Sequence, residues 1–249
     1  MRALRIAAIL VALTTPGGLA QAPRVPVLVE LYTSEGCSSC PPADALLESL
    51  LRDQPIQRAE VVPIGLHVDY FNDLGWKDAF SSAAFTNRQR RYLRRFSEDL
   101  YTPEMVIDGQ HAIPGNEVDL VRREIESAAQ QPHLPVRVTA RLVADQLRLT
   151  IHVPPAPPQA EKIQIVAAIT ENGLSSAVTR GENRGRTLHH AAVARIVQEL
   201  DLLSVTGAVL EKQLPLGEDW HHAALNAVVW LQGTKSRHVY GTATAIPTE

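Results

Sequence analysis

The two cysteines of this 249-residue chain stand three positions apart in the segment EGCSSCPP, residues 35–42. An apolar run, Val27 to Leu31, precedes them, and leucines at helical spacing (46, 47, 50 and 51) follow. The CxxC spacing therefore falls where a buried strand passes into a helix. The start of a helix carries unpaired N–H groups and a partial positive charge, which favour a thiolate and so activate the sulfur that attacks a disulfide.

This chemistry assigns a role to each cysteine. Cys37 is the expected attacking sulfur and Cys40 the resolving one, because the helix screens its second cysteine more than its first. His67, near the end of the second apolar run, is a candidate proton acceptor. A histidine in such a place is also commonly an ordinary core-edge residue, so this assignment stays open. The redox interpretation requires no cofactor beyond the cysteine pair.

Two other interpretations of the cysteines compete with redox chemistry. A passive disulfide over about four residues gives roughly 2 kcal/mol in the chain-entropy model, against roughly 4.7 kcal/mol for a loop of about a hundred residues. A closed zinc site takes four ligands. A Cu(I) or zinc site would therefore need further ligands besides the two sulfurs, with His67 as the candidate third.

The first 22 residues are typical of an export signal. Arg2 and Arg5 precede an apolar stretch over residues 6–13, and Ala20-Gln21-Ala22 provides a small-x-small cleavage site. The apolar stretch is shorter than the roughly 20 residues of a membrane helix. A retained anchor is the alternative. We expect a periplasmic or secreted bacterial protein, in a compartment where disulfides persist.

Composition bounds the partners. The apolar fraction of 45% and the charged fraction of 20% are ordinary for a globular protein with a core. The net charge of −3 gives no reason to expect nucleic acid, whose binding domains are usually basic. The expected partner is a thiol- or disulfide-containing protein or small molecule, with no nucleic acid and no membrane once the signal is removed.

The first half of the chain alternates strands and helices. Strands are predicted over 25–32 and 60–68, helices over 43–52, 81–96 and 117–129, and a hairpin over 104–113 around the turn signal Asp108-Gly109. Asn116 is the expected N-cap of the third helix. The second helix carries arginines at 88, 90, 91, 94 and 95, which indicate either a solvated face or an anion-binding one.

This order resembles the thioredoxin fold over residues 25–131, with Thr102-Pro103 in the place of that family's cis-proline motif. The resemblance implies that Pro103 is cis and packs beside the disulfide. It also implies that the backbone of Thr102 meets the substrate chain. A cis X-Pro bond costs little and usually marks a tight turn. An ordinary trans proline at a strand start is the alternative.

The segments VELYTSEGCSSCPPAD, YTPEMVIDG and GENRGRTLHH more closely resemble a family of secreted bacterial proteins that carry a domain of unknown function with a thioredoxin-like fold. The chain departs from thioredoxin itself at Gly36, where that protein has Trp, and at Ser38-Ser39. A reduction potential therefore cannot be transferred. The charge of Glu35 should oppose a thiolate, whereas the helix start favours it.

Beyond Pro132 the apolar residues alternate at period two, as in Val136 to Leu142, Leu147 to Val153 and Ile163 to Ile169. Such alternation predicts half-buried antiparallel strands. Further apolar runs bring the total to about seven strands, enough for a β-sandwich. The predicted fold is an α/β thioredoxin-like domain, residues 23–132, followed by an all-β sandwich-like domain, residues 133–249.

The leading hypothesis from the sequence is a periplasmic thiol-disulfide oxidoreductase that uses Cys37 and Cys40. The Cu(I) or zinc protein described above is one alternative. A non-catalytic scaffold, in which the β-domain is the working surface, is another.

Overall fold

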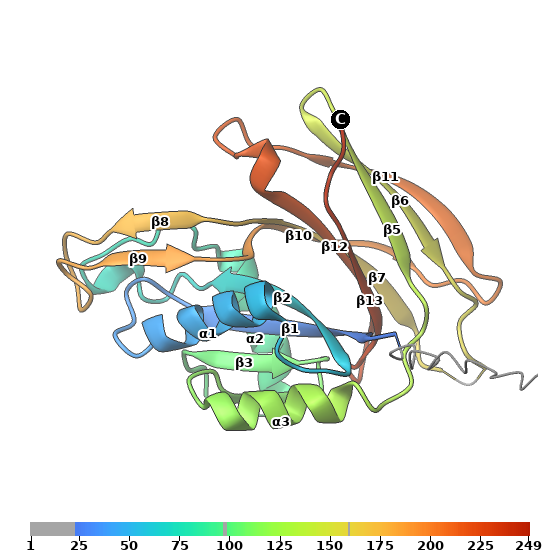
Figure 1. Ribbon diagram of the computed structural model, residues 1–249, viewed down its shortest axis with the longest axis horizontal. Helices are drawn as coiled ribbons and strands as arrows, with labels where there is room; N and C mark the ends of the chain where they lie inside the picture. The colour runs from blue at the N-terminus through green and yellow to red at the C-terminus, as the bar shows by residue number, and fades with distance from the viewer. Residues whose placement is uncertain (1–22, 97–98, 159) are drawn as a thin grey trace, which may run out of the picture.

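The computed structural model describes residues 23–96, 99–158 and 160–249 (Figure 1). The expected export signal, residues 1–22, lies outside the described residues. Within the described part of the chain, no helix combines the length and the apolar character needed to cross a membrane.

Strands and helices alternate in the first half of the chain, as predicted. The strands are β1 (Val25–Thr33), β2 (Ala59–His67), β3 (Glu104–Ile107) and β4 (His111–Pro114). The helices are α1 (Pro41–Asp53), η1 (Asn72–Leu74), α2 (Ala83–Phe96) and α3 (Val118–Ala128). The N-cap of α3 is Glu117, so the prediction of Asn116 is wrong by one residue.

The second half is formed almost entirely of strands. These are β5 (Arg137–Val143), β6 (Gln146–Val153), β7 (Ile163–Glu171), β8 (Leu174–Ala177), β9 (Thr187–His190), β10 (Val193–Leu202), β11 (Ala208–Pro215), β12 (Leu225–Gly233) and β13 (Val239–Ala245), with a short helix η2 (His222–Ala224). Three strands, β8, β9 and β10, were not predicted: β8 and β9 have only four residues each, and charged or polar residues interrupt the apolar residues of β10.

The predicted fold class, a thioredoxin-like domain followed by a separate sandwich-like β-domain, is wrong. One mixed sheet of eight strands, in the order β13-β12-β7-β10-β2-β1-β3-β4, runs through both halves of the chain. β1 and β2 are parallel, as the α1 crossover between them requires. β10 joins the halves: Val193 pairs with Gly65 of β2, whose N–H also donates to the Ala192 carbonyl at 2.8 Å.

The wrong prediction of a separate β-domain has a physical cause, which strand β7 illustrates. The alternation of Ile163 to Ile169 predicted a strand with one solvated face, but eight of its nine residues are buried. Both faces are covered because β7 lies inside the large sheet. Residues such as Ala167 and Ala168 fit either environment, so periodicity alone could not distinguish a central strand from a half-exposed one.

Three apolar clusters hold the layers together. Alternate residues of β1 face α1 and α3 on one side of the sheet and α2 on the other. The α2 side also contains Val166 of β7 and Trp230 of β12, so this core is shared by both halves of the chain. A three-stranded sheet, β11-β6-β5, covers the opposite face of β7 and β12. The β8-β9 hairpin lies apart from it, beside α1 (Figure 1).

Candidate functional site

A disulfide joins Cys37 and Cys40 between the end of β1 and the start of α1. Cys40 is the N-cap residue, and prolines occupy the first helical positions. The carbonyl oxygen of Cys40 accepts hydrogen bonds from the N–H groups of Ala43 and Asp44, at 2.9 and 3.1 Å. The sulfur pair therefore lies at a helix start, where negative charge on a sulfur is favoured.

The oxidised pair is almost fully buried. The exposed fraction is 2% for Cys37 and 0% for Cys40, whereas Ser38 and Ser39 between them are exposed. The Sγ atom of Cys37 lies 3.4 Å from Oγ of Ser39. Cys37 is thus only marginally the more exposed cysteine, and both sulfurs lie beneath the surface of the turn.

Pro103 lies beside this turn, and the Thr102–Pro103 peptide bond is cis, as the resemblance implied. Oγ of Ser39 is 3.5 Å from the carbonyl oxygen of Thr102. A Cβ added to Gly115 would lie 3.3 Å from Cβ of Ala43 and 3.4 Å from Cβ of Pro103, so the proline and the first turn of α1 are close neighbours. The structure brings Thr102 and Pro103 to the cysteine turn.

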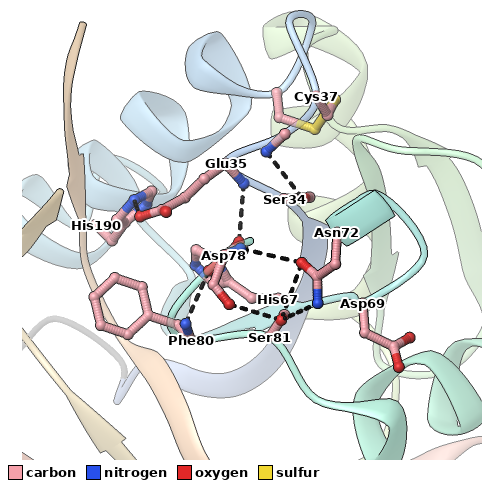
Figure 2. Close-up of polar contacts among 12 residues, drawn as sticks. Ser34, Glu35, Cys37, His67, Asp69, Asn72, Asp78, Phe80, Ser81 and His190 are labelled. Carbon is pink, nitrogen blue, oxygen red and sulfur yellow. Dashed lines mark hydrogen bonds and ion pairs between the residues drawn. A yellow bond between two sulfur atoms is a disulfide. The ribbon is translucent and has the colours of Figure 1, made fainter. Parts of the chain in front are cut away.

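A buried cluster of acids and imidazoles lies next to the turn (Figure 2). The Glu35 carboxylate accepts the indole N–H of Trp76 at 2.7 Å and lies 3.2 Å from Nε2 of His190. Asp78 accepts the backbone N–H of Glu35 at 2.9 Å, and the same oxygen lies 2.7 Å from Nδ1 of His67. The ring centroids of His67 and His190 are 4.7 Å apart. The side chain of Glu35 is thus held by protein donors.

Burial and pairing shift the proton affinities in this cluster. Burial acts to lower the pKa of His67, but the charge and hydrogen bond of Asp78 outweigh it and raise that pKa. Burial likewise acts to raise the pKa of Asp78, but His67 and backbone N–H groups bring it below its ordinary value. The pKa of Asp44, one turn into α1, is raised by burial, against the opposing effect of the two histidines. The pair His67 and Asp78 therefore favours its charged form.

The loop between β8 and β9, residues 178–186, closes the other side of the turn. The side-chain nitrogen of Asn183 is 2.9 Å from the carbonyl oxygens of both Glu35 and Cys37. A carboxylate oxygen of Glu182 accepts the backbone N–H of Ser38 at 3.0 Å. The segment GENRGRTLHH, to which the sequence analysis gave no role, therefore contributes directly to the cysteine turn.

Sequence reasoning missed Asn183, Glu182 and His190 as residues of this site. The only signal was the dense polar character of GENRGRTLHH, residues 181–190. Neighbouring residues on a strand point to opposite faces, and accordingly His190 is buried whereas His189 is exposed. No pattern within the segment could show that its buried face meets residues about 150 positions earlier.

His67 belongs to the buried cluster, where its side chain is hydrogen-bonded to Asp78 and not to a cysteine. Asp69, two residues after His67 in the chain, points away from the cluster (Figure 2). Its carboxylate accepts the Thr86 hydroxyl near the start of α2. Across residues 23–96, 99–158 and 160–249, no group of three or more His, Cys, Asp or Glu side chains is placed to hold a metal ion.

The arginine-rich helix α2 divides into a structural arginine and a surface group. Arg88 is buried and forms two hydrogen bonds with the carboxylate of Glu30, at 2.5 and 3.1 Å. Its Nη2 atom also donates to Gln232 of β12, and its guanidinium lies over Trp230. The arginines at 90, 91, 94 and 95 are exposed. Arg88 therefore ties α2 to both halves of the large sheet and is not free to bind a partner.

Comparison with known proteins gives a family and a fold. A family model described as protein of unknown function (DUF1223) matches residues 28–232. Protein AGR_C_4864 from Agrobacterium tumefaciens, known from an X-ray crystal structure, is 24% identical with a TM-score of 0.69, over 91% of this chain and 96% of that one. HBP35 of Porphyromonas gingivalis is 13% identical with a TM-score of 0.63, over 90% of this chain and 77% of that one. At these identities the likeness shows the fold alone. No protein with a curated description matches the chain.

Proposed function

The chain belongs to the DUF1223 family of proteins of unknown function, and we propose that it is a thiol-disulfide oxidoreductase that exchanges electrons with a partner through Cys37 and Cys40. The observation that carries the proposal is the disulfide at the first turn of α1, with Pro103 beside it. A disulfide closing so short a loop contributes little to stability, about 2 kcal/mol. Such a pair in an activating position favours exchange over a purely structural role.

The exchange takes two substitutions at sulfur. The Cys37 thiolate of the reduced protein attacks one sulfur of a partner disulfide, forms a mixed disulfide and expels the other partner sulfur as a thiolate. The Cys40 thiolate then attacks Sγ of Cys37 and releases the second partner sulfur. Two electrons and two protons pass to the partner, and the disulfide between Cys37 and Cys40 results. The reverse sequence reduces the protein.

Two groups near the cysteine pair, the backbone of Thr102 and the side chain of His67, have proposed roles in the exchange. The Thr102 carbonyl, close to Ser39, is a backbone acceptor for an extended partner chain at the turn. His67 remains the candidate proton acceptor, a role that needs its neutral form and therefore a pH above its pKa, which Asp78 raises against the effect of burial. The cysteine pair holds the exchanged electrons itself, so the proposed reaction uses no further cofactor.

The proposed setting is the bacterial periplasm or the extracellular space, in keeping with the signal-like sequence of residues 1–22. Disulfides persist there, and partners with exchangeable cysteines are available. The proposed partner is a protein or small molecule that carries a thiol or a disulfide.

The test is reversible titration of the cysteine pair in glutathione buffers, together with trapping in a Cys40→Ser variant. We expect a two-electron equilibrium and a mixed disulfide that forms on Cys37. Cys37→Ser is the matched control, because it removes the attacking sulfur and should trap nothing. A pair that cannot be reduced and reoxidised in the folded protein, with no adduct on Cys37, would refute the proposal.

A further inference from the structure

One amide nitrogen connects the β8-β9 loop to the cysteine turn. Nδ2 of Asn183 is 2.9 Å from the carbonyl oxygens of Glu35 and Cys37, and the residue is fully buried. Its Oδ1 atom accepts a hydrogen bond from Nη1 of Arg186 at 2.9 Å, which fixes the orientation of the amide. A primary amide is well suited here, because a single nitrogen carries two N–H donors and the adjacent oxygen accepts.

We propose that Asn183 is a positioning residue for the disulfide: it holds the turn in the form that shields Cys37, and release of its two hydrogen bonds precedes exchange. This inference rests on the proposed oxidoreductase function and identifies the step that limits access to the sulfur. Its side-chain nitrogen is bonded to backbone carbonyl oxygens and not to the sulfur atoms that react. It acts through the backbone on either side of Gly36.

Three observations support this role. Cys37 is 2% exposed although both residues after it are exposed, so the turn lies at the surface with its sulfur covered. The same loop also contacts Ser38, through Glu182, so the turn is held on two sides of Cys37. Gly36 also lies close to Phe71, since an added Cβ would lie 2.9 Å from Cβ of that residue. The hydrogen bonds from the β8-β9 loop and the contact with Phe71 therefore hold the turn together in its closed form.

The experiment measures the rate at which dithiothreitol reduces the oxidised full-length protein, followed by alkylation and mass spectrometry. Asn183→Ala removes the amide, and Asn183→Asp keeps its shape but replaces the two donors by a carboxylate oxygen that repels the carbonyls. Ser175→Ala is the matched control, because Ser175 is exposed on β8 of the same hairpin. Glu182→Ala, on an exposed side chain, loosens the turn without removing a buried group.

We expect reduction to be about tenfold faster in Asn183→Ala and Asn183→Asp, the order expected for the loss of two hydrogen bonds. Glu182→Ala should be about threefold faster, corresponding to one exposed bond. Ser175→Ala should match the wild type. At low urea concentrations, the reduction rate of the Asn183 variants should rise with urea as weakly as that of the wild type. Local opening of the turn exposes little surface, whereas global unfolding exposes much.

Rates for both Asn183 variants within twofold of the wild type would overturn the positioning role. An acceleration with the steep urea dependence of global unfolding would overturn it as well. If the Asn183 variants do not fold, an unchanged rate in Glu182→Ala decides against the proposal. In each of these cases the oxidoreductase function still stands if the wild-type pair titrates reversibly. A wild-type pair that neither titrates nor forms an adduct contradicts the function itself.

Discussion

Nε2 of His190 lies 3.2 Å from a carboxylate oxygen of Glu35, although 155 residues separate the two in the chain. Both residues are buried, and the other carboxylate oxygen accepts the indole N–H of Trp76. A buried carboxylate is tolerated only where donors surround it. Three distant segments therefore meet beside the disulfide, because each provides a hydrogen-bond partner for a polar group of another. A substitution in one of them should destabilise the whole site.

Removal of the Glu35 carboxylate should destabilise the protein strongly. Glu35→Ala leaves the buried His190 and the part-buried indole N–H of Trp76 without their acceptor, and we expect a loss of about 3–5 kcal/mol. Equilibrium urea unfolding of the oxidised protein measures it. Glu60→Ala, an exposed acid on β2, serves as the control and should change stability by about 0.5 kcal/mol or less. Equal effects of the two substitutions would contradict the structural role of Glu35.

Stability should fall with rising pH through the pair of His67 and Asp78. Burial acts to lower the pKa of His67, but Asp78 raises it above its usual value. The stabilisation from the charged imidazole is therefore complete below about pH 6.5 and is lost as the pH rises through the raised folded-state pKa. We expect the wild type to lose more unfolding free energy between about pH 6 and pH 9 than His67→Gln does. Urea unfolding at each pH measures this, and parallel pH profiles would argue against it.

Arg88 should be essential for stability and the exposed arginines of α2 should not. Arg88→Ala leaves the Glu30 carboxylate buried without its cation, for which we expect a cost of about 3–5 kcal/mol in unfolding free energy. Arg90→Ala removes the same kind of side chain from the exposed face and should cost about 0.5 kcal/mol or less. Denaturant unfolding of both variants decides. A small loss for Arg88→Ala would mean that Glu30 finds other partners.

The close approach of Gly36 and Phe71 should be sensitive to a single methyl group. The added Cβ of Gly36→Ala would lie 2.9 Å from Cβ of Phe71, so the turn or the segment around Phe71 must shift, at a cost of about 1–3 kcal/mol. We expect lower thermal stability of the oxidised protein and faster reduction of the disulfide. Phe71→Gly in the same chain removes the Cβ atom that the added methyl group meets and should partly restore both values. Absence of any rescue would show that the strain lies elsewhere.

The local structure of the first half of the chain was readable from the sequence. The strand before the cysteines, the helix after them and the hairpin over 104–113 follow from apolar periodicity and turn signals, which act within a few residues. The bounds of β1 and α2 differ from the predictions by one or two residues at a single end. The cis bond before Pro103 followed from resemblance, because no local pattern distinguishes it from a trans bond.

The assembly of the sheet could not be predicted in this way. The outer edge of β2 needs a partner because the strand is buried on both faces, and β10 supplies it. Alternation records how each strand is buried but not which strand lies beside it. The separate β-domain was therefore predicted wrongly, although the sequence does contain strands at β5, β6, β7, β11, β12 and β13.

The sequence by itself determined where the sulfurs are and what precedes and follows them, because helix starts, strands and turns are set by neighbouring residues. Only the tertiary structure decided what surrounds the sulfurs. Asn183 and His190 reach the turn through long-range hydrogen bonds with Cys37 and Glu35. These contacts depend on the pairing of β10 with β2. That pairing is favoured because it buries apolar side chains and gives hydrogen-bond partners to the backbone at the edge of β2, and both effects involve residues far apart in the chain.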